Sequence, residues 1–225
     1  MHILLSVFIA LCLTLTGCSS NIVKPTEFSG YLANYAQLNE ATGVDGEKTL
    51  RWKSGDFTAE NYHQVLIKDA VFHPKPQVSK QVTTETLDAL VRYSSKKLQT
   101  EAAKRQLLAS KAGKGIVSIR TAITGVKISP EALHPLEIIP FKLVLAGAGA
   151  AIGFRDHDLM VYYEIVGEDS LSHKPLFTVV RKIKGDTLDS KWDKMEVKDM
   201  HKIINQLSEQ GIEALAKALT PTHAQ

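Results

Sequence analysis

The chain has 225 residues, of which 44% are hydrophobic and 23% charged, and its formal net charge is +3. This composition is that of an ordinary globular protein, and the length allows one substantial hydrophobic core. So mild a positive charge argues against a nucleic-acid-binding protein, whose Lys and Arg residues gather into a strongly basic surface.

An apolar run at residues 3–15 predicts a signal peptide at residues 1–17. The run is shorter than the roughly 20 apolar residues of a membrane-spanning helix, and small residues follow it. The sequence Leu15, Thr16, Gly17, Cys18 resembles a lipobox, in which a diacylglycerol is attached to the cysteine sulfur and the chain is cleaved just before that residue. No Lys or Arg precedes the apolar run, so an uncleaved or non-lipidated signal peptide is the alternative.

The cysteine count adds to this prediction. The chain has two cysteines, of which Cys12 would leave with the signal peptide and Cys18 would carry the lipid. The mature chain would then contain no free thiol, which excludes disulfides, cysteine-based zinc sites and thiolate catalysis. Ser19 follows the lipidated cysteine, and by resemblance to other lipoproteins this implies an outer-membrane location, with palmitate on Cys18 and the domain facing the periplasm.

The mature chain divides into three parts. Residues 18–53 are polar and predict a lipidated N-terminus and tether, residues 54–221 a single α+β domain, and residues 222–225 a tail. Within the tether, four apolar side chains recur at helical spacing and are expected to pack on the domain. These are Tyr31, Leu32, Tyr35 and Leu38.

The first half of the domain predicts a strand, a helix and a second strand. Residues 65–72 are apolar and end at two prolines, as expected for a strand. A long helix follows, capped by Thr83 or Thr84 and ending near Gly113. Residues 116–126 alternate between apolar and polar side chains, which predicts a half-buried strand.

The second half predicts two paired strands and a closing helix. Residues 159–165 and 176–183 are the strands, joined by a turn at residues 168–174. Residues 192–219 carry an apolar stripe at helical spacing and are expected to bend at Gly211.

The resulting fold class is α+β with the order β-α-β-β-β-α. We expect a mainly antiparallel sheet of about four strands, covered on one face by two long helices and partly exposed on the other. A Gly/Ala-rich apolar insert interrupts the order at residues 136–154.

Three segments and the lipobox together resemble an uncharacterised family of Gram-negative bacterial lipoproteins, classed as a domain of unknown function. The segments are residues 29–38 (SGYLANYAQL), 62–69 (YHQVLIKD) and 115–120 (GIVSIR). The resemblance covers most of the mature chain. It implies membership and localisation but no active site, since the family has none to transfer.

The Gly/Ala-rich insert has two open interpretations. A dinucleotide site is excluded, because no helix follows Gly147 and Gly149 before the next strand. A membrane span is excluded by Glu137, Pro140 and Lys142. The insert is therefore either buried within the domain or a surface for self-association or membrane contact, in which Gly149 and Gly153 have helix-packing spacing.

No catalytic motif or metal site is predicted. Asp156, His157 and Asp158 have ligand-type side chains, but in an extended chain the two carboxylates face away from the imidazole, so a polar turn is the preferred interpretation. A basic side of the first helix could meet an anionic envelope component or simply be solvated. Its residues are Arg92, Lys96, Lys97, Lys104 and Arg105.

We therefore expect a non-enzymatic, membrane-anchored periplasmic lipoprotein that binds another envelope component, either a protein partner or a second copy of itself, with no cofactor, nucleotide or nucleic acid. The alternative is an envelope hydrolase whose carboxylates are brought together only by folding. Its candidates are Asp156, Asp158, Glu164 and Glu168. A deep pocket lined by carboxylates would favour the hydrolase.

Overall fold

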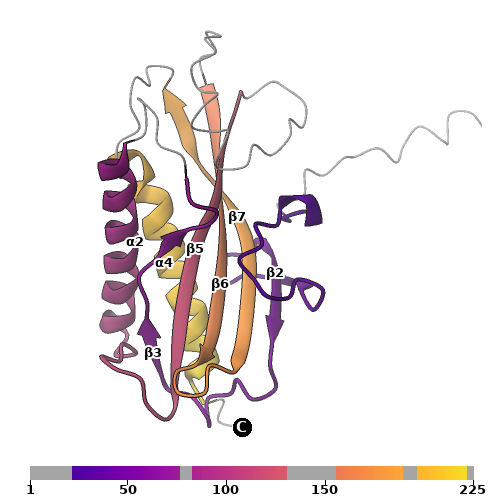
Figure 1. The fold of residues 1–225 in the computed structure, drawn as a ribbon, viewed down its shortest axis with the longest axis vertical. Helices are drawn as coiled ribbons and strands as arrows, with labels where there is room; N and C mark the ends of the chain where they lie inside the picture. Colours follow the sequence, from indigo (N-terminus) through magenta and orange to yellow (C-terminus); the bar gives the residue numbers. More distant parts are fainter. Residues whose placement is uncertain (1–21, 77–82, 131–155, 190–196, 222–225) are drawn as a thin grey trace, which may run out of the picture.

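The computed structural model describes residues 22–76, 83–130, 156–189 and 197–221. In these ranges one sheet is covered by two long helices on one face (Figure 1). The elements in chain order are η1 (Pro25–Glu27), β1 (Asn39–Thr42), β2 (Lys48–Lys53), β3 (Gln64–Ile67), β4 (Val71–Phe72), α2 (Thr84–Lys104), β5 (Ile116–Pro130), β6 (Asp156–Asp169), β7 (Pro175–Asp189) and α4 (Val197–Leu219).

The sheet is mixed. Its described strands follow the order β1-β2-β7-β6-β5-β3, and β4 also pairs with β5. β3 and β4 run parallel to β5, whereas the other neighbours are antiparallel. The predicted four-stranded, mainly antiparallel sheet is therefore wrong: the sheet has seven strands, and two of them make parallel pairs.

Two physical reasons explain this difference. β1 and β2 lie in the region expected to be a tether, and as short strands near the sheet edge they expose most of their side chains, so their sequences lack an apolar stripe. Residues 65–72 form two strands instead of one, because the chain leaves the sheet between Ile67 and Val71. A parallel pair requires a long crossover, and α2 supplies it between β4 and β5.

Helix α2 begins as its sequence predicts. Thr83 is the N-cap, and its hydroxyl accepts a hydrogen bond from the backbone N–H of Thr86 at 3.3 Å. The helix ends at Lys104 instead of near Gly113, because the chain then turns to pair with β3. The Val65 N–H donates to the Leu107 carbonyl at 2.8 Å, and the Ala109 N–H donates to the Val65 carbonyl at 2.9 Å.

The main core lies between the two helices and the sheet. Alternate residues of the strands face the helices, as the pattern predicts for residues 116–126 and 159–165. Leu87 and Leu90 of α2 meet Ile203 and Ile204 of α4 over Val161 of β6. These side chains are buried, so this layer contributes a large share of the hydrophobic stabilisation.

Residues 22–38 cover part of the other face of the sheet, while Arg120 on that face keeps 43% of its side chain exposed, as expected for a partly exposed face. Val23 and Leu32 of this segment are buried against Tyr162, Val166 and Val180 of the sheet. The sequence did indicate contact from this segment through its tyrosines and leucines, but not that the contact starts as early as Val23.

A buried carboxylate holds this N-terminal segment to the sheet. Glu164 of β6 is 1% exposed and accepts hydrogen bonds from the backbone N–H of Ser29 at 3.1 Å and from the Tyr35 hydroxyl at 2.5 Å. The Tyr35 oxygen in turn accepts hydrogen bonds from the backbone N–H groups of Gly30 and Leu32, at 2.9 and 3.2 Å. Tyr35 therefore links the segment's backbone to the buried charge.

We predict that Tyr35→Phe lowers the free energy of unfolding by about 1–3 kcal/mol, because it leaves buried polar groups without their partner. The N-terminal segment should also become sensitive to proteases in the folded protein. The measurements are chemical denaturation and limited proteolysis with mass spectrometry.

The matched control is Tyr93→Phe, which removes a hydroxyl that donates to the Asn205 side chain at 2.9 Å, between α2 and α4. That variant should lose stability without new cleavage at residues 22–38. Equal protection of the segment in Tyr35→Phe and the natural protein would contradict this account of Glu164.

Candidate functional site

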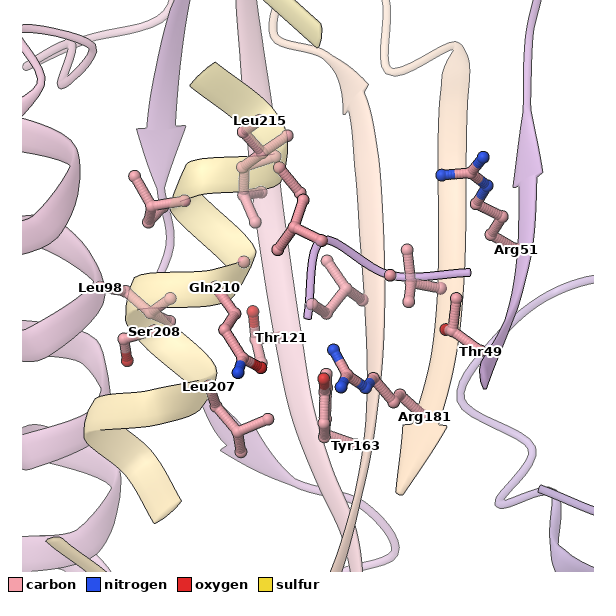
Figure 2. A pocket seen from close by; sticks show the side chains of 18 of the residues that line it. Thr49, Arg51, Leu98, Thr121, Tyr163, Arg181, Leu207, Ser208, Gln210 and Leu215 are labelled. Atoms are coloured by element: carbon pink, nitrogen blue, oxygen red, sulfur yellow. The ribbon is translucent and has the colours of Figure 1, made fainter. Parts of the chain in front are cut away.

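A cavity of about 590 Å³ lies between α4 and the helix-facing side of the sheet (Figure 2). Its floor is formed by alternate residues of β5, β6 and β7, and its other wall by the C-terminal two thirds of α4. The buried apolar lining comprises Phe57, Ile119, Ile123, Val161, Phe177, Met200, Ile204 and Ile212. A volume in this range and a mainly apolar lining are typical of small-molecule sites.

The mouth of the cavity lies between α4 and β2 with its preceding turn. Exposed lining residues mark it, namely Thr42, Val44, Arg51, Lys53, Ala214 and Lys217. Three of these six are cationic, and among the described residues of the lining there is no Asp or Glu. Part of this charge is already compensated, since Lys217 pairs with Glu213 at 2.6 Å.

Arg181 of β7 is the most unusual lining residue. It is only 6% exposed, and its guanidinium Nη2 pairs with the Asp45 carboxylate in the turn before β2. Its Nε–H has no hydrogen-bond partner among the described residues. Desolvating a charged group is costly unless its donors are satisfied, so the unused Nε–H of this lining residue is a candidate donor for an external acceptor.

Two other polar groups accompany Arg181. Tyr163 of β6 lies beside it, and burial raises the pKa of the Tyr163 phenol above its ordinary value although the Arg181 charge opposes this, so the phenol stays protonated. Gln210 reaches from α4 toward the same region, and its side-chain Oε1 is buried without a partner (Figure 2). An unsatisfied donor and an unsatisfied acceptor thus line the same cavity.

Gly211 leaves part of this space open. A Cβ atom built on Gly211 would meet nothing within 4 Å, although the residue lies inside α4 and lines the cavity. α4 is continuous through Gly211, from Val197 to Leu219, and the predicted bend at this residue stays a prediction. The glycine therefore costs helix stability and keeps room in the cavity.

Seven of the residues singled out from the sequence lie outside the described residues. These are Leu15, Thr16, Gly17 and Cys18 of the lipobox, and Gly147, Gly149 and Gly153 of the apolar insert. Their predicted roles stay predictions. Asp156, His157 and Asp158 begin β6, with His157 between Pro130 and Leu188 in the strand register, so the expected turn is part of a strand.

Of the candidate carboxylates of a hydrolase, the structure places neither Glu164 nor Glu168 at the cavity. Glu164 is held by Ser29 and Tyr35 on the opposite face of the sheet. Glu168 pairs with Arg120 at 3.2 Å and with His173 at 3.3 Å. Within the described ranges, no group of three or more His, Cys, Asp or Glu side chains could hold a metal ion.

One buried carboxylate pairs with three of the cations on the basic side of α2. Buried Glu101 pairs with Lys97 at 3.0 Å, with Lys104 at 2.9 Å and with Arg105 at 3.1 Å. Three of the five cations that were expected to meet an anionic partner therefore pair with a carboxylate near the C-terminal end of α2. Among the helices that the structure describes, none is long and apolar enough to cross a membrane.

The sequence did not single out Arg181, Tyr163 or Gln210 as site residues. One signal was present in the sequence. One face of β7 carries Phe177, Val179, Arg181 and Ile183. An arginine among three apolar residues at inward positions indicates a buried charge, and a buried charge needs partners.

The fold and the cavity define an α+β protein with an internal, mainly apolar cavity. Residues 27–210 match the family described as "Protein of unknown function (DUF3313)". The chain is 34% identical over 201 residues to the uncharacterized lipoprotein YdcL of Escherichia coli (strain K12), an alignment that covers 88% of this chain and 90% of that protein. The chain belongs to the DUF3313 family, which confirms the resemblance to an uncharacterised bacterial lipoprotein family and supports membrane association.

Two solved structures are distantly similar. A putative neuraminyllactose-binding hemagglutinin homolog from Helicobacter pylori has 10% identity and a TM-score of 0.39, covering 74% of this chain and 87% of that one. The rare lipoprotein B from Shewanella oneidensis has 12% identity and a TM-score of 0.34, covering 70% of this chain and 93% of that one. At TM-scores below 0.5, neither likeness informs the function of this chain.

The Glu101 cluster predicts a specific pH dependence. Hydrogen bonds from Lys104 and then Lys97 lower the pKa of Glu101 from its ordinary value of 4.5 to about 2. A group with a lowered folded-state pKa stabilises the protein above its unfolded pKa, and this contribution is lost as the pH falls through the folded value. Glu101→Gln should therefore be less stable than the natural protein at pH 7.

The stability difference between the two proteins should shrink between about pH 4.5 and pH 2. Urea denaturation of both proteins across this range measures it. Glu209→Gln, an exposed position on α4, is the control and should show no such trend. A difference that stays constant down to pH 2 would rule out the ion-pair cluster as its cause.

Proposed function

We propose that this protein is a non-enzymatic lipoprotein, acylated on Cys18, that sits on the periplasmic side of the outer membrane and binds another component of the cell envelope. The observation that carries the binding role is the cavity between α4 and the sheet, which has a ligand-sized volume and no carboxylate in its lining.

The alternative, a hydrolase with carboxylates assembled by the fold, has less support. Its candidates Glu164 and Glu168 make structural contacts on the face away from the cavity. Hydrolysis by a carboxylate pair needs two such groups facing one substrate. The described cavity lining offers a phenol, an amide and a guanidinium instead.

The N-terminal segment leaves only a short stretch of chain between the proposed lipid on Cys18 and the folded domain. Val23 is 2% exposed in contact with the sheet, and Cys18 precedes it by five residues. Five residues span at most roughly 18 Å, since an extended chain advances about 3.6 Å per residue. A lipid on Cys18 would therefore hold the domain next to the membrane surface, within reach of membrane-derived ligands.

The anchoring part of the proposal is tested with Cys18→Ser. This variant should incorporate no palmitate and should leave the outer-membrane fraction, because the thioether cannot form. Cys12→Ser is the matched control and should behave as the natural protein, since Cys12 lies within the predicted signal peptide. Palmitate labelling and density-gradient fractionation are the measurements. Palmitate incorporation into Cys18→Ser would contradict the assignment.

The binding part is tested by photocrosslinking in cells that export the lipidated protein. A photoreactive residue in place of Arg51, at the cavity mouth, should give a discrete adduct with an envelope component. The same residue in place of exposed Arg92 on α2 is the control and should not give that adduct. Identical adduct patterns at the two positions would count against binding at the cavity.

A further inference from the structure

We propose that the cavity binds an amphiphile with a single acyl chain and an anionic head group, with the chain between α4 and the sheet and the head group at Arg181. This inference rests on the proposed binding function and specifies its ligand. The shape of the lining, the orphaned polar groups and the charge at the mouth each support it.

The apolar part of the site suits a chain and not a flat polar molecule. Between the sheet and α4, the floor side chains Ile119, Val161 and Phe177 face Ile204 and Ile212 of the helix. Each methylene moved from water into such a lining contributes about 0.8 kcal/mol. The absence of a side chain at Gly211 widens the space along α4 by at least a methyl group.

The polar part of the site suits an anion. Arg181 offers an unpartnered Nε–H donor, and Asp45 occupies only one edge of its guanidinium. A carboxylate or phosphate oxygen can accept from this donor, and such a charge-assisted hydrogen bond is about twice as strong as a neutral one. The neutral Tyr163 phenol beside it brings no opposing charge to the head group.

The mouth of the cavity strengthens this choice of charge. Arg51 and Lys53 stand at the mouth on β2, on the same face as Arg181, and no lining residue is acidic. Lys53 also lies over the Phe57 ring, 5.5 Å from its centroid, which keeps the ammonium near the entrance. An anionic ligand would thus meet a favourable potential on entry.

The experiment uses the full lipidated protein in lipid nanodiscs and a palmitate analogue with a photoreactive diazirine in its chain. After irradiation, peptide mapping should place the adducts on residues 197–219 and on the inward residues of β5 to β7. Labelling should saturate and should be reduced by unlabelled palmitate or palmitoyl lysophosphatidic acid, two sources of the same chemistry. Neutral monopalmitoylglycerol should compete at least about tenfold more weakly, because it lacks the charge.

Two pairs of variants complete the test. Gly211→Phe fills the cavity and should remove the labelling of α4, whereas Gly211→Ala should retain it while raising helix stability. Arg181→Gln should weaken competition by palmitate about tenfold, whereas Arg120→Gln, on the other face of the sheet, should not. The Gly211 pair keeps the test decisive if Arg181→Gln does not fold.

Adducts spread over the exposed surface, labelling unchanged in Gly211→Phe, or equal competition by monopalmitoylglycerol would each overturn the inference. A discrete adduct from position 51 in cells, without acyl labelling of the cavity, would leave the binding function standing and reject this ligand. Acyl labelling of the cavity in nanodiscs, with no discrete adduct from position 51 in cells, would support the acyl ligand and count against a crosslinkable partner at the cavity mouth.

Discussion

The structure depends on a mismatch in width between the sheet and its helices. Six strands side by side span roughly 24 Å at about 4.8 Å per step, and two helices of about 10 Å each cover less. α2 packs on α4 and β3, and α4 packs on β7, so the face near β2 extends beyond the helices (Figure 1). The cavity opens where this coverage ends, and the inward Arg181 is part of its lining.

On the opposite face of the sheet, residues 22–38 cover the region around Tyr162, Val166 and Val180. The buried carboxylate of Glu164 requires donors, and Ser29 and Tyr35 of that segment supply them. The two faces therefore have separate roles in this account. One fixes the chain close to its proposed lipid anchor, and the other holds the proposed ligand.

The sequence predicted the helices and strands better than their arrangement in the sheet. Both long helices and the alternating strands follow from the spacing of apolar residues, and Thr83 marks the start of α2 as expected. β1 and β2 were missed because short strands near the sheet edge, here with polar sequences, carry no apolar stripe. Parallel pairing of β3 and β4 with β5 depends on the path of a crossover, which local periodicity does not encode.

The site was harder to predict because its residues come from three separate elements, β6, β7 and α4, whose packing is not visible in the local sequence pattern. Arg181 interrupts an apolar face and could have been noticed. Gly211 was predicted to bend the helix, because the open space beside it can be recognised only in the folded protein. The carboxylates were considered as catalytic candidates from their residue type alone. Their partners, Ser29 and Tyr35 for Glu164 and Arg120 for Glu168, become visible only once the sheet is assembled.

The most direct test of the account is a crystal structure of the protein with a fatty acid brominated at the end of its chain. We expect an anomalous bromine peak between α4 and β5, with carboxylate density at hydrogen-bonding distance from Arg181 Nε. A cavity closed by collapse of Leu207 and Gln210 onto the sheet, or bromine bound only on the outer surface, would contradict the claim that this protein holds an acyl chain within its fold.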